Sequence, residues 1–222
     1  MILNFKNLLK DRRYQMWFSL LIISLIGIIT MFISTYIYGS ADRTYWKEAF
    51  ILFLYFTFIS NIFAVVISSL VVFNKIPLGN KHIQRSKVMM VVNLTITSII
   101  FWAVLSGKIA SYGPVAMTST IIVHTITPTF AIFVFFYEGI KTKILDKDKI
   151  SPKTTTIINV SMPFIWMVMA TVVYLSLGMD KEAAIYSFLD FKGNWIMSLI
   201  IIPSIAITYP ALTYLYAWLY NK

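Results

Sequence analysis

Residues 17–39 read WFSLLIISLIGIITMFISTYIYG and contain no charged side chain. This stretch exceeds the roughly 20 apolar residues that a helix needs to cross a bilayer, so it predicts a membrane span. Five more uncharged stretches follow it, at residues 49–73, 88–106, 114–137, 157–178 and 195–219. They lack the strict alternation of a barrel strand, and only a helix satisfies its own backbone groups in lipid. The sequence therefore predicts an all-α integral membrane bundle of six transmembrane helices.

The composition indicates a chain that lies almost wholly in the membrane. Of its 222 residues, 59% are hydrophobic and 13% are charged, whereas a soluble domain carries about a quarter charged residues. Six spans use nearly the whole length, so we expect one transmembrane domain over residues 1–222. The absence of cysteine excludes disulfides, thiolate nucleophiles and cysteine metal sites. The excess of Lys over Arg, with many Ile and Asn residues, is typical of an AT-rich bacterial genome.

The first stretch shares two features with a signal peptide, because basic residues precede it and Ser40-Ala41 follow it. A signal peptide has an apolar core of about 7–15 residues, and the run here is longer. We therefore interpret it as a retained membrane span.

The positive charges predict the orientation of the spans. Of the 19 Lys and Arg residues, 14 lie in the N-terminal segment, in the loops at 74–87 and 138–156, or at Lys222. The others are Arg43, Lys47, Lys108, Lys181 and Lys192. Since cytoplasmic loops are enriched in Lys and Arg, both termini are expected in the cytoplasm and the chain in the cell membrane. The net charge of +10 then reflects topology and contact with anionic lipid headgroups, and no motif predicts a nucleic-acid partner.

His124 is the one side chain within the six predicted spans that titrates near neutral pH. Ionisable residues at such depth are costly and often functional. The alternative is a neutral histidine that bridges two helices through hydrogen bonds. The helical rise places His124 ~15 Å and Thr57 ~12 Å below the outer ends of their spans. The two side chains are therefore expected at one level on parallel helices.

Further polar residues near this level extend the candidate site: Asn61, Asn93, Thr97, Thr120 and Thr127. Asn61 shares a helix face with Thr57, and Asn93 shares one with Thr97. Each is a candidate for binding substrate or stabilising an oxyanion. The alternatives are local, because a Thr hydroxyl usually donates to a carbonyl four residues back and Asn often joins neighbouring helices.

A hydroxyl beside an imidazole is a nucleophile–base pair, because the neutral ring takes the proton as the hydroxyl attacks an ester carbonyl. Thr57 and His124 are thus candidate catalytic residues. Glu138 lies ~21 Å along the helix from His124 and is too far away to orient its ring, so a change there is expected to be nearly silent. A metal is not expected, since His82 lies in a loop at another depth and a catalytic zinc takes three protein ligands.

Two short segments resemble a known family. Residues 55–61, YFTFISN, and residues 124–128, HTITP, followed by Glu138, are similar to segments of the androgen-induced transmembrane threonine hydrolases and their bacterial six-span relatives. The chain length and the number of spans agree as well. The resemblance implies an enzyme that cleaves fatty acid esters of hydroxy fatty acids with a Thr57–His124 dyad. It implies no cofactor, and it implies membrane lipids and an acyl-chain substrate as partners.

Two other functions remain open. Six spans in this length match the substrate-binding subunit of vitamin importers, but such subunits dock through small residues on their first span. Residues 17–39 have no alanine and a single internal glycine, Gly27. Cation-coupled carriers usually need a buried carboxylate, which the predicted spans lack, although prolines can mark broken helices around a transport site: Pro128, Pro163, Pro203 and Pro210. The third function is a structural or assembly role, with the polar residues joining helices.

Overall fold

The computed structural model of the chain describes residues 11–38, 51–73, 80–111, 113–141, 149–176, 186, 189–190 and 192–222. Within these ranges every regular element is a helix. The α-helices are α2 (Arg12–Tyr38), α4 (Phe56–Val72), α5 (Lys81–Ile100), α6 (Pro114–Ile121), α7 (Thr127–Lys141), α8 (Pro152–Asn159), α9 (Ser161–Ser176) and α10 (Trp195–Tyr220). Two π-helical turns, η1 (Phe101–Leu105) and η3 (Ile122–Ile126), and the 3₁₀ helix η2 (Ser106–Ser111) complete the set.

Among the described residues, five helical segments are long and apolar enough to cross a membrane. They are Arg12–Tyr38, Lys81–Leu105, Pro114–Ile140, Pro152–Ser176 and Trp195–Tyr220. Helix α4 is a shorter apolar helix of 17 residues. The prediction of an all-α chain with several membrane-crossing helices is therefore confirmed.

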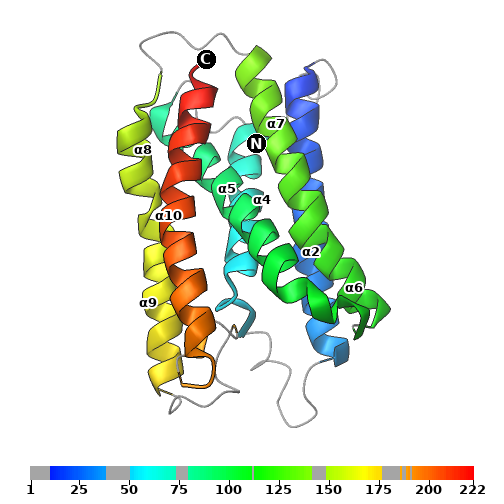
Figure 1. Ribbon diagram of the computed structural model, residues 1–222. Helices are drawn as coiled ribbons and strands as arrows, with labels where there is room; N and C mark the ends of the chain where they lie inside the picture. Colours follow the sequence, from blue (N-terminus) through cyan, green and yellow to red (C-terminus); the bar gives the residue numbers. More distant parts are fainter. Residues whose placement is uncertain are drawn as a thin grey trace.

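The helices form an elongated bundle with α5 near its centre (Figure 1). Helices α2, α6 and α7 lie on one side of α5, and α8, α9 and α10 lie on the other (Figure 1). Helix α5 contacts α4, α7 and α10, and α4 also packs against α2. The buried core follows from this order, because most side chains of α5 from Val88 to Ile96 are buried and apolar.

The outer helices present large apolar side chains outward. Ile29 of α2, Ile165 of α9 and Leu199 of α10 are all more than half exposed. An apolar surface of this extent is stable where lipid, rather than water, surrounds the protein. The same helices carry no Lys, Arg, Asp or Glu in their middle sections.

Local sequence signals explain where several helices begin. The Asn80 side chain accepts a hydrogen bond of 2.8 Å from the backbone N–H of His82, and Ser151 caps α8 in the same way. Pro114 and Pro152 occupy the first helical positions, where their missing N–H costs nothing.

The prolines considered as markers of broken helices have ordinary settings here. Helix α10 runs through Pro203 and Pro210 as one helix, and Pro163 lies in the first turn of α9. Pro128 follows η3 directly. Proline cannot donate to the carbonyl four residues back and its ring crowds that carbonyl. The wider π-turn before Pro128 is a local adjustment of the kind that accommodates a proline in a membrane helix.

The second span differs from the expected continuous helix beginning at Ala49. A short helical turn ends at Leu52, two turn residues follow, and Tyr55 is extended at φ −77° and ψ 123°. Helix α4 therefore begins at Phe56, and Thr57 lies in its first turn rather than two turns inside a span. The apolar run from Ile51 to Phe58 carries no glycine, proline or charge that would indicate this break.

Among the described residues, two charged side chains that flank predicted apolar stretches pair with each other inside the bundle. Lys87 of α5 and Glu138 of α7 are fully buried, and Lys87 Nζ lies 2.7 Å from Oε1 and 2.8 Å from Oε2 of Glu138. Trp17 of α2 donates its indole N–H to the same carboxylate at 3.1 Å. The helices extend past the apolar stretches, and the two charges neutralise each other. Glu138 thereby gains a structural role that the sequence interpretation did not assign.

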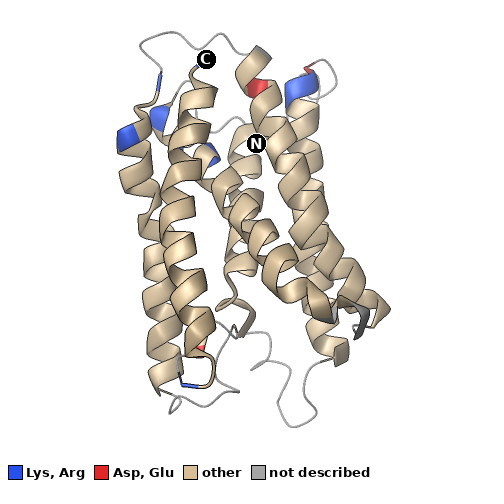
Figure 2. Cartoon of the chain, viewed as in Figure 1, with Lys and Arg blue, Asp and Glu red and all other residues tan. Residues whose placement is uncertain are grey.

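The ion pair lies toward the end of the bundle where the C-terminus is found. Figure 2 shows most of the described Lys and Arg residues at this end. The Lys87 ammonium also lies 5.0 Å from the centre of the Trp17 ring. The pair thus joins α2, α5 and α7 through three side-chain hydrogen bonds and a cation–π contact.

Candidate functional site

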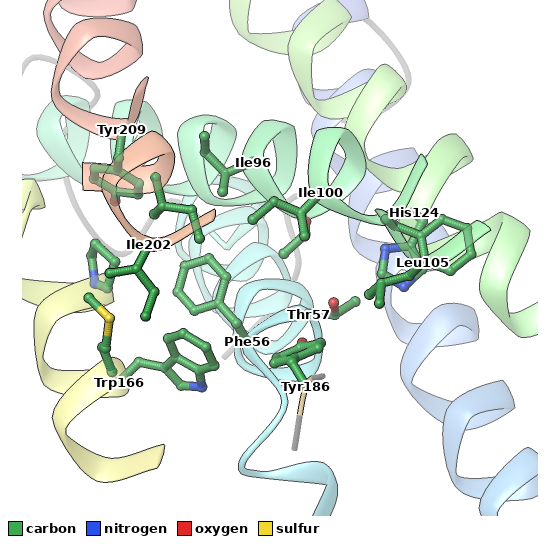
Figure 3. Close-up of a pocket in the computed structure, with 15 residues that line it drawn as sticks. Phe56, Thr57, Ile96, Ile100, Leu105, His124, Trp166, Tyr186, Ile202 and Tyr209 are labelled. Carbon is green, nitrogen blue, oxygen red and sulfur yellow. The ribbon is translucent and has the colours of Figure 1, made fainter. Parts of the chain in front are cut away.

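A cavity lies among α4, α5, α9, α10 and the two π-turns, with Tyr186 at its wall (Figure 3). Its empty volume, including the space at its open side, is about 580 Å³. Its polar lining residues are Thr57, Thr97, His124, Tyr186 and Tyr209. The apolar lining residues are Phe56, Ile96, Ile100, Phe101, Leu105, Pro163, Trp166, Met167, Ile202 and Ile205.

Thr57 enters this cavity from the first turn of α4. Its side chain is buried, and both Thr57 and Tyr186 line the cavity. In Figure 3 the Thr57 side chain lies between Tyr186 and the His124 ring.

His124 is the central residue of the π-turn η3. Its ring stacks on Phe101 of η1, with centroids 4.0 Å apart and planes inclined by 16°. Its Nδ1 atom is buried and has no hydrogen-bond partner among the described residues. The ring therefore has one nitrogen free to act as a base toward a group in the cavity.

The two π-turns are tied to each other beside the cavity. In addition to the Phe101–His124 stack, the Trp102 indole N–H of η1 donates to Thr125 Oγ1 of η3 at 3.1 Å. π-Turns inside α-helices are rare and occur frequently at functional sites. This pairing of two π-turns fixes the direction in which His124 faces the cavity.

The structure thus brings three of the predicted site residues to one cavity: Thr57, Thr97 and His124. The Thr97 hydroxyl donates back to the carbonyls of Asn93 and Leu94, at 3.1 and 2.9 Å. This is the local arrangement weighed as the alternative for threonine. The catalytic roles of Thr57 and His124 stay a prediction.

Four predicted site residues lie outside the cavity lining: Asn61, Asn93, Thr120 and Thr127. Asn61 donates to the Thr57 carbonyl at 2.9 Å, and its Oδ1 atom faces Gly27 of α2. Asn93 accepts from the Tyr209 hydroxyl at 2.7 Å. Thr127 is buried and Thr120 is half-buried, away from the cavity. These side chains join or fill the spaces between helices in this arrangement.

Sequence reasoning missed two polar residues of the lining, Tyr209 of α10 and Tyr186. Tyr186 belongs to the segment between α9 and α10, and its ring contacts Tyr55 and Trp166 edge-on. Sequence periodicity describes faces of helices, so it gives no information on a loop residue that folds back into the bundle. Nothing in the spacing around Tyr186 indicates this position.

Within the described residues, no group of three or more His, Asp or Glu side chains gathers to hold a metal ion. Comparison with known proteins gives no further information on the site. No protein-family model, no curated protein and no solved structure matches the chain.

Proposed function

We propose that this chain is a membrane hydrolase that cleaves lipophilic esters, with Thr57 as nucleophile and His124 as general base. One observation carries the proposal: Thr57 and His124 line the same, mostly apolar cavity inside a membrane-type bundle. A hydroxyl is unreactive at its own pKa and needs an adjacent base. Among the described lining residues, His124 is the side chain that can serve as that base.

The reaction has two halves. Thr57 Oγ1 attacks the ester carbonyl carbon while His124 takes the hydroxyl proton, and a C–O bond forms. The tetrahedral intermediate collapses as the bond to the alcohol oxygen breaks, and His124 returns the proton to that leaving group. Water then attacks the acyl-threonine with His124 again as base, which releases the acid and restores the Thr57 hydroxyl.

The lining favours a long-chain ester over a small polar one. Phe56, Trp166, Met167 and Ile202 supply an apolar surface against which an acyl chain can pack. The resemblance to threonine hydrolases adds fatty acid esters of hydroxy fatty acids as the expected substrate class. The substrate would then enter from the lipid, in which such esters dissolve.

Labelling and turnover of the purified protein in detergent test the proposal. A fluorophosphonate probe and a long-chain fluorogenic ester should react with the wild type. Thr57→Ala should abolish both signals, and His124→Ala should lower turnover by about 10²–10⁴-fold. Thr95→Ala is the matched control, because the Thr95 hydroxyl is bonded to the Val91 carbonyl at 2.7 Å and lies outside the cavity. Full turnover in folded Thr57→Ala would refute the hydrolase proposal. Absence of labelling in the wild type, together with binding of a small polar solute, would favour another function.

We also propose six membrane spans, both termini in the cytoplasm and location in the cell membrane. Helix α4 is the sixth span, since its 17 residues reach ~26 Å, close to the thickness of the hydrocarbon core. The excess of basic residues at one end of the bundle supports this orientation. Reporters fused after Lys81 and Asp146 should read cytoplasmic, and those after Arg43 and Lys181 external. An external signal after Lys81 would contradict this topology.

A further inference from the structure

Tyr209 closes the end of the cavity that lies away from His124 (Figure 3). The side chains of Tyr209 and Ile96 are 1% and 3% exposed, and Pro163 of the same lining is also buried. At the opposite end, Leu105 and His124 are both partly exposed. The cavity is therefore closed at Tyr209 and more accessible at the end that holds His124.

Hydrogen bonds behind the cavity hold the Tyr209 ring in this position. The Tyr209 hydroxyl donates to Asn93 Oδ1 of α5 at 2.7 Å, and the Asn93 amide donates to the Met162 sulfur of α9 at 2.8 Å. Neither Asn93 nor Met162 lines the cavity. Side-chain networks of this kind rigidify the part of the core that they join. The closed end is thus a fixed wall rather than a side chain that a ligand pushes aside.

Helix α5 gives the length of the space between the two ends. Asn93, which binds Tyr209, and Phe101, which stacks on His124, are eight positions apart in the sequence. At about 1.5 Å per residue this separation is ~12 Å. An extended backbone advances at most ~3.6 Å per residue, or ~1.2 Å per covalent bond, so this length accommodates an extended chain of about ten carbon atoms.

The space between the two ends suits an alkyl chain rather than a polar one. Phe56, Ile100 and Ile202 line it with side chains that carry no polar atom (Figure 3). The Trp166 indole N–H is already engaged, since it donates to the Leu54 carbonyl at 2.7 Å. A polar chain would lose its hydrogen bonds to water here without gaining others, which is costly.

We infer that Tyr209 is a specificity-determining residue that sets the longest acyl chain the cavity accepts in full. The inference rests on the proposed function. With the ester carbonyl carbon at Thr57 Oγ1, the acyl chain runs along α5 and its terminal methyl group meets the Tyr209 ring. Chains of up to about ten carbons fit this length. Each further methylene must bend the chain or displace the ring, and both are unfavourable in a packed interior.

Hydrolysis of a series of fluorogenic fatty acyl esters, from butanoyl to palmitoyl, by the full-length protein in detergent tests the inference. In the wild type, kcat/KM should rise with chain length up to the decanoyl ester and then fall. In Tyr209→Ala the fall should begin at longer chains. The ratio of kcat/KM for the palmitoyl ester over the decanoyl ester should therefore rise about tenfold or more, since one methylene in an apolar pocket is worth at least about that factor.

Two further variants make the test specific to the closed end. Tyr216→Ala is the matched control, because it also removes a buried tyrosine from α10 but lies outside the cavity lining. Its dependence of kcat/KM on chain length should match that of the wild type. Ile96→Phe adds bulk at the closed end, so the fall in kcat/KM should begin at shorter chains.

The outcomes separate this inference from the proposed function. A fall that begins at the same chain length in Tyr209→Ala as in the wild type, or that moves equally in Tyr216→Ala, overturns the inference while the hydrolase stands. If the wild type hydrolyses no ester of the series, the proposed function fails instead. If Tyr209→Ala does not fold, Tyr209→Leu and Ile96→Phe decide: shifts in opposite directions support the inference, and an unmoved fall in either variant overturns it.

Discussion

The ion pair between Lys87 and Glu138 allows a quantitative test of how the bundle is held together. Both side chains are at most 2% exposed, and Nζ lies within 2.8 Å of both carboxylate oxygens. Lys87→Met leaves a buried carboxylate with the Trp17 N–H as its remaining neighbour. Glu138→Gln leaves a buried ammonium facing a neutral amide. Breaking a buried pair on one side typically costs about 3–5 kcal/mol of unfolding free energy.

Removal of both charges together should cost far less than the sum of the two single changes. In Lys87→Met with Glu138→Leu, neither charge is left buried, and apolar replacements of a buried pair are often neutral or stabilising by about 1–4 kcal/mol. The expected coupling between the two positions is therefore at least about 3 kcal/mol, well above the few tenths found for independent sites.

Unfolding of the purified protein by SDS titration in mixed micelles measures these free energies. Asp11→Asn is the matched control: Asp11 pairs with Arg13 at 3.1 Å, but its side chain is 43% exposed. The asparagine keeps the cap on the Arg13 N–H, so the loss should stay below about 1 kcal/mol. Single variants at Lys87 and Glu138 that behave like this control, or losses that simply add in the double variant, would refute the reasoning.

Two smaller changes test the packing around the site. Gly27→Val should destabilise the protein by about 1–3 kcal/mol, because a Cβ at Gly27 would already lie 3.0 Å from the buried Val123 Cγ1. Adding Val123→Ala in the same chain should recover most of this loss in stability. If the loss is not recovered, the steric strain does not arise from contact with Val123. Tyr209→Phe removes the hydroxyl that donates to Asn93 Oδ1, a buried hydrogen bond of 2.7 Å. The unfolding free energy should fall by about 0.6–1.7 kcal/mol. No change in the SDS midpoint would mean that this hydrogen bond makes no net contribution to stability.

The all-α fold and part of the site could be predicted because both depend on regular helix geometry. Uncharged stretches locate the helices, and the rise per residue brings Thr57, Thr97 and His124 near one level. The rise gives depth but not direction around the axis, which is why Asn93 and Thr127, at similar depth, lie outside the cavity. Directions around the axis depend on packing and on the extra residue of each π-turn, which hydropathy does not record.

The remaining features depend on contacts between distant parts of the chain. Considered one at a time, Lys87 and Glu138 each predict the end of a membrane span, because an isolated charge in lipid is costly. Together they are compatible with burial, but the two residues are 51 positions apart and nothing local joins them. Tyr186 was missed for the same reason, since its role arises from a loop that meets the start of α4.

The π-turns have a consequence for how this chain compares with others. A π-turn is equivalent to an α-helix with one inserted residue, which rotates everything beyond it by roughly 100° about the helix axis. A homologue that lacked one residue within 122–126 would keep the same helices and loops but turn its histidine away from the nucleophile. An alignment of such a homologue with this chain needs a single-residue gap in the middle of a membrane span, and an alignment that forbids gaps inside spans would misplace His124 by one position.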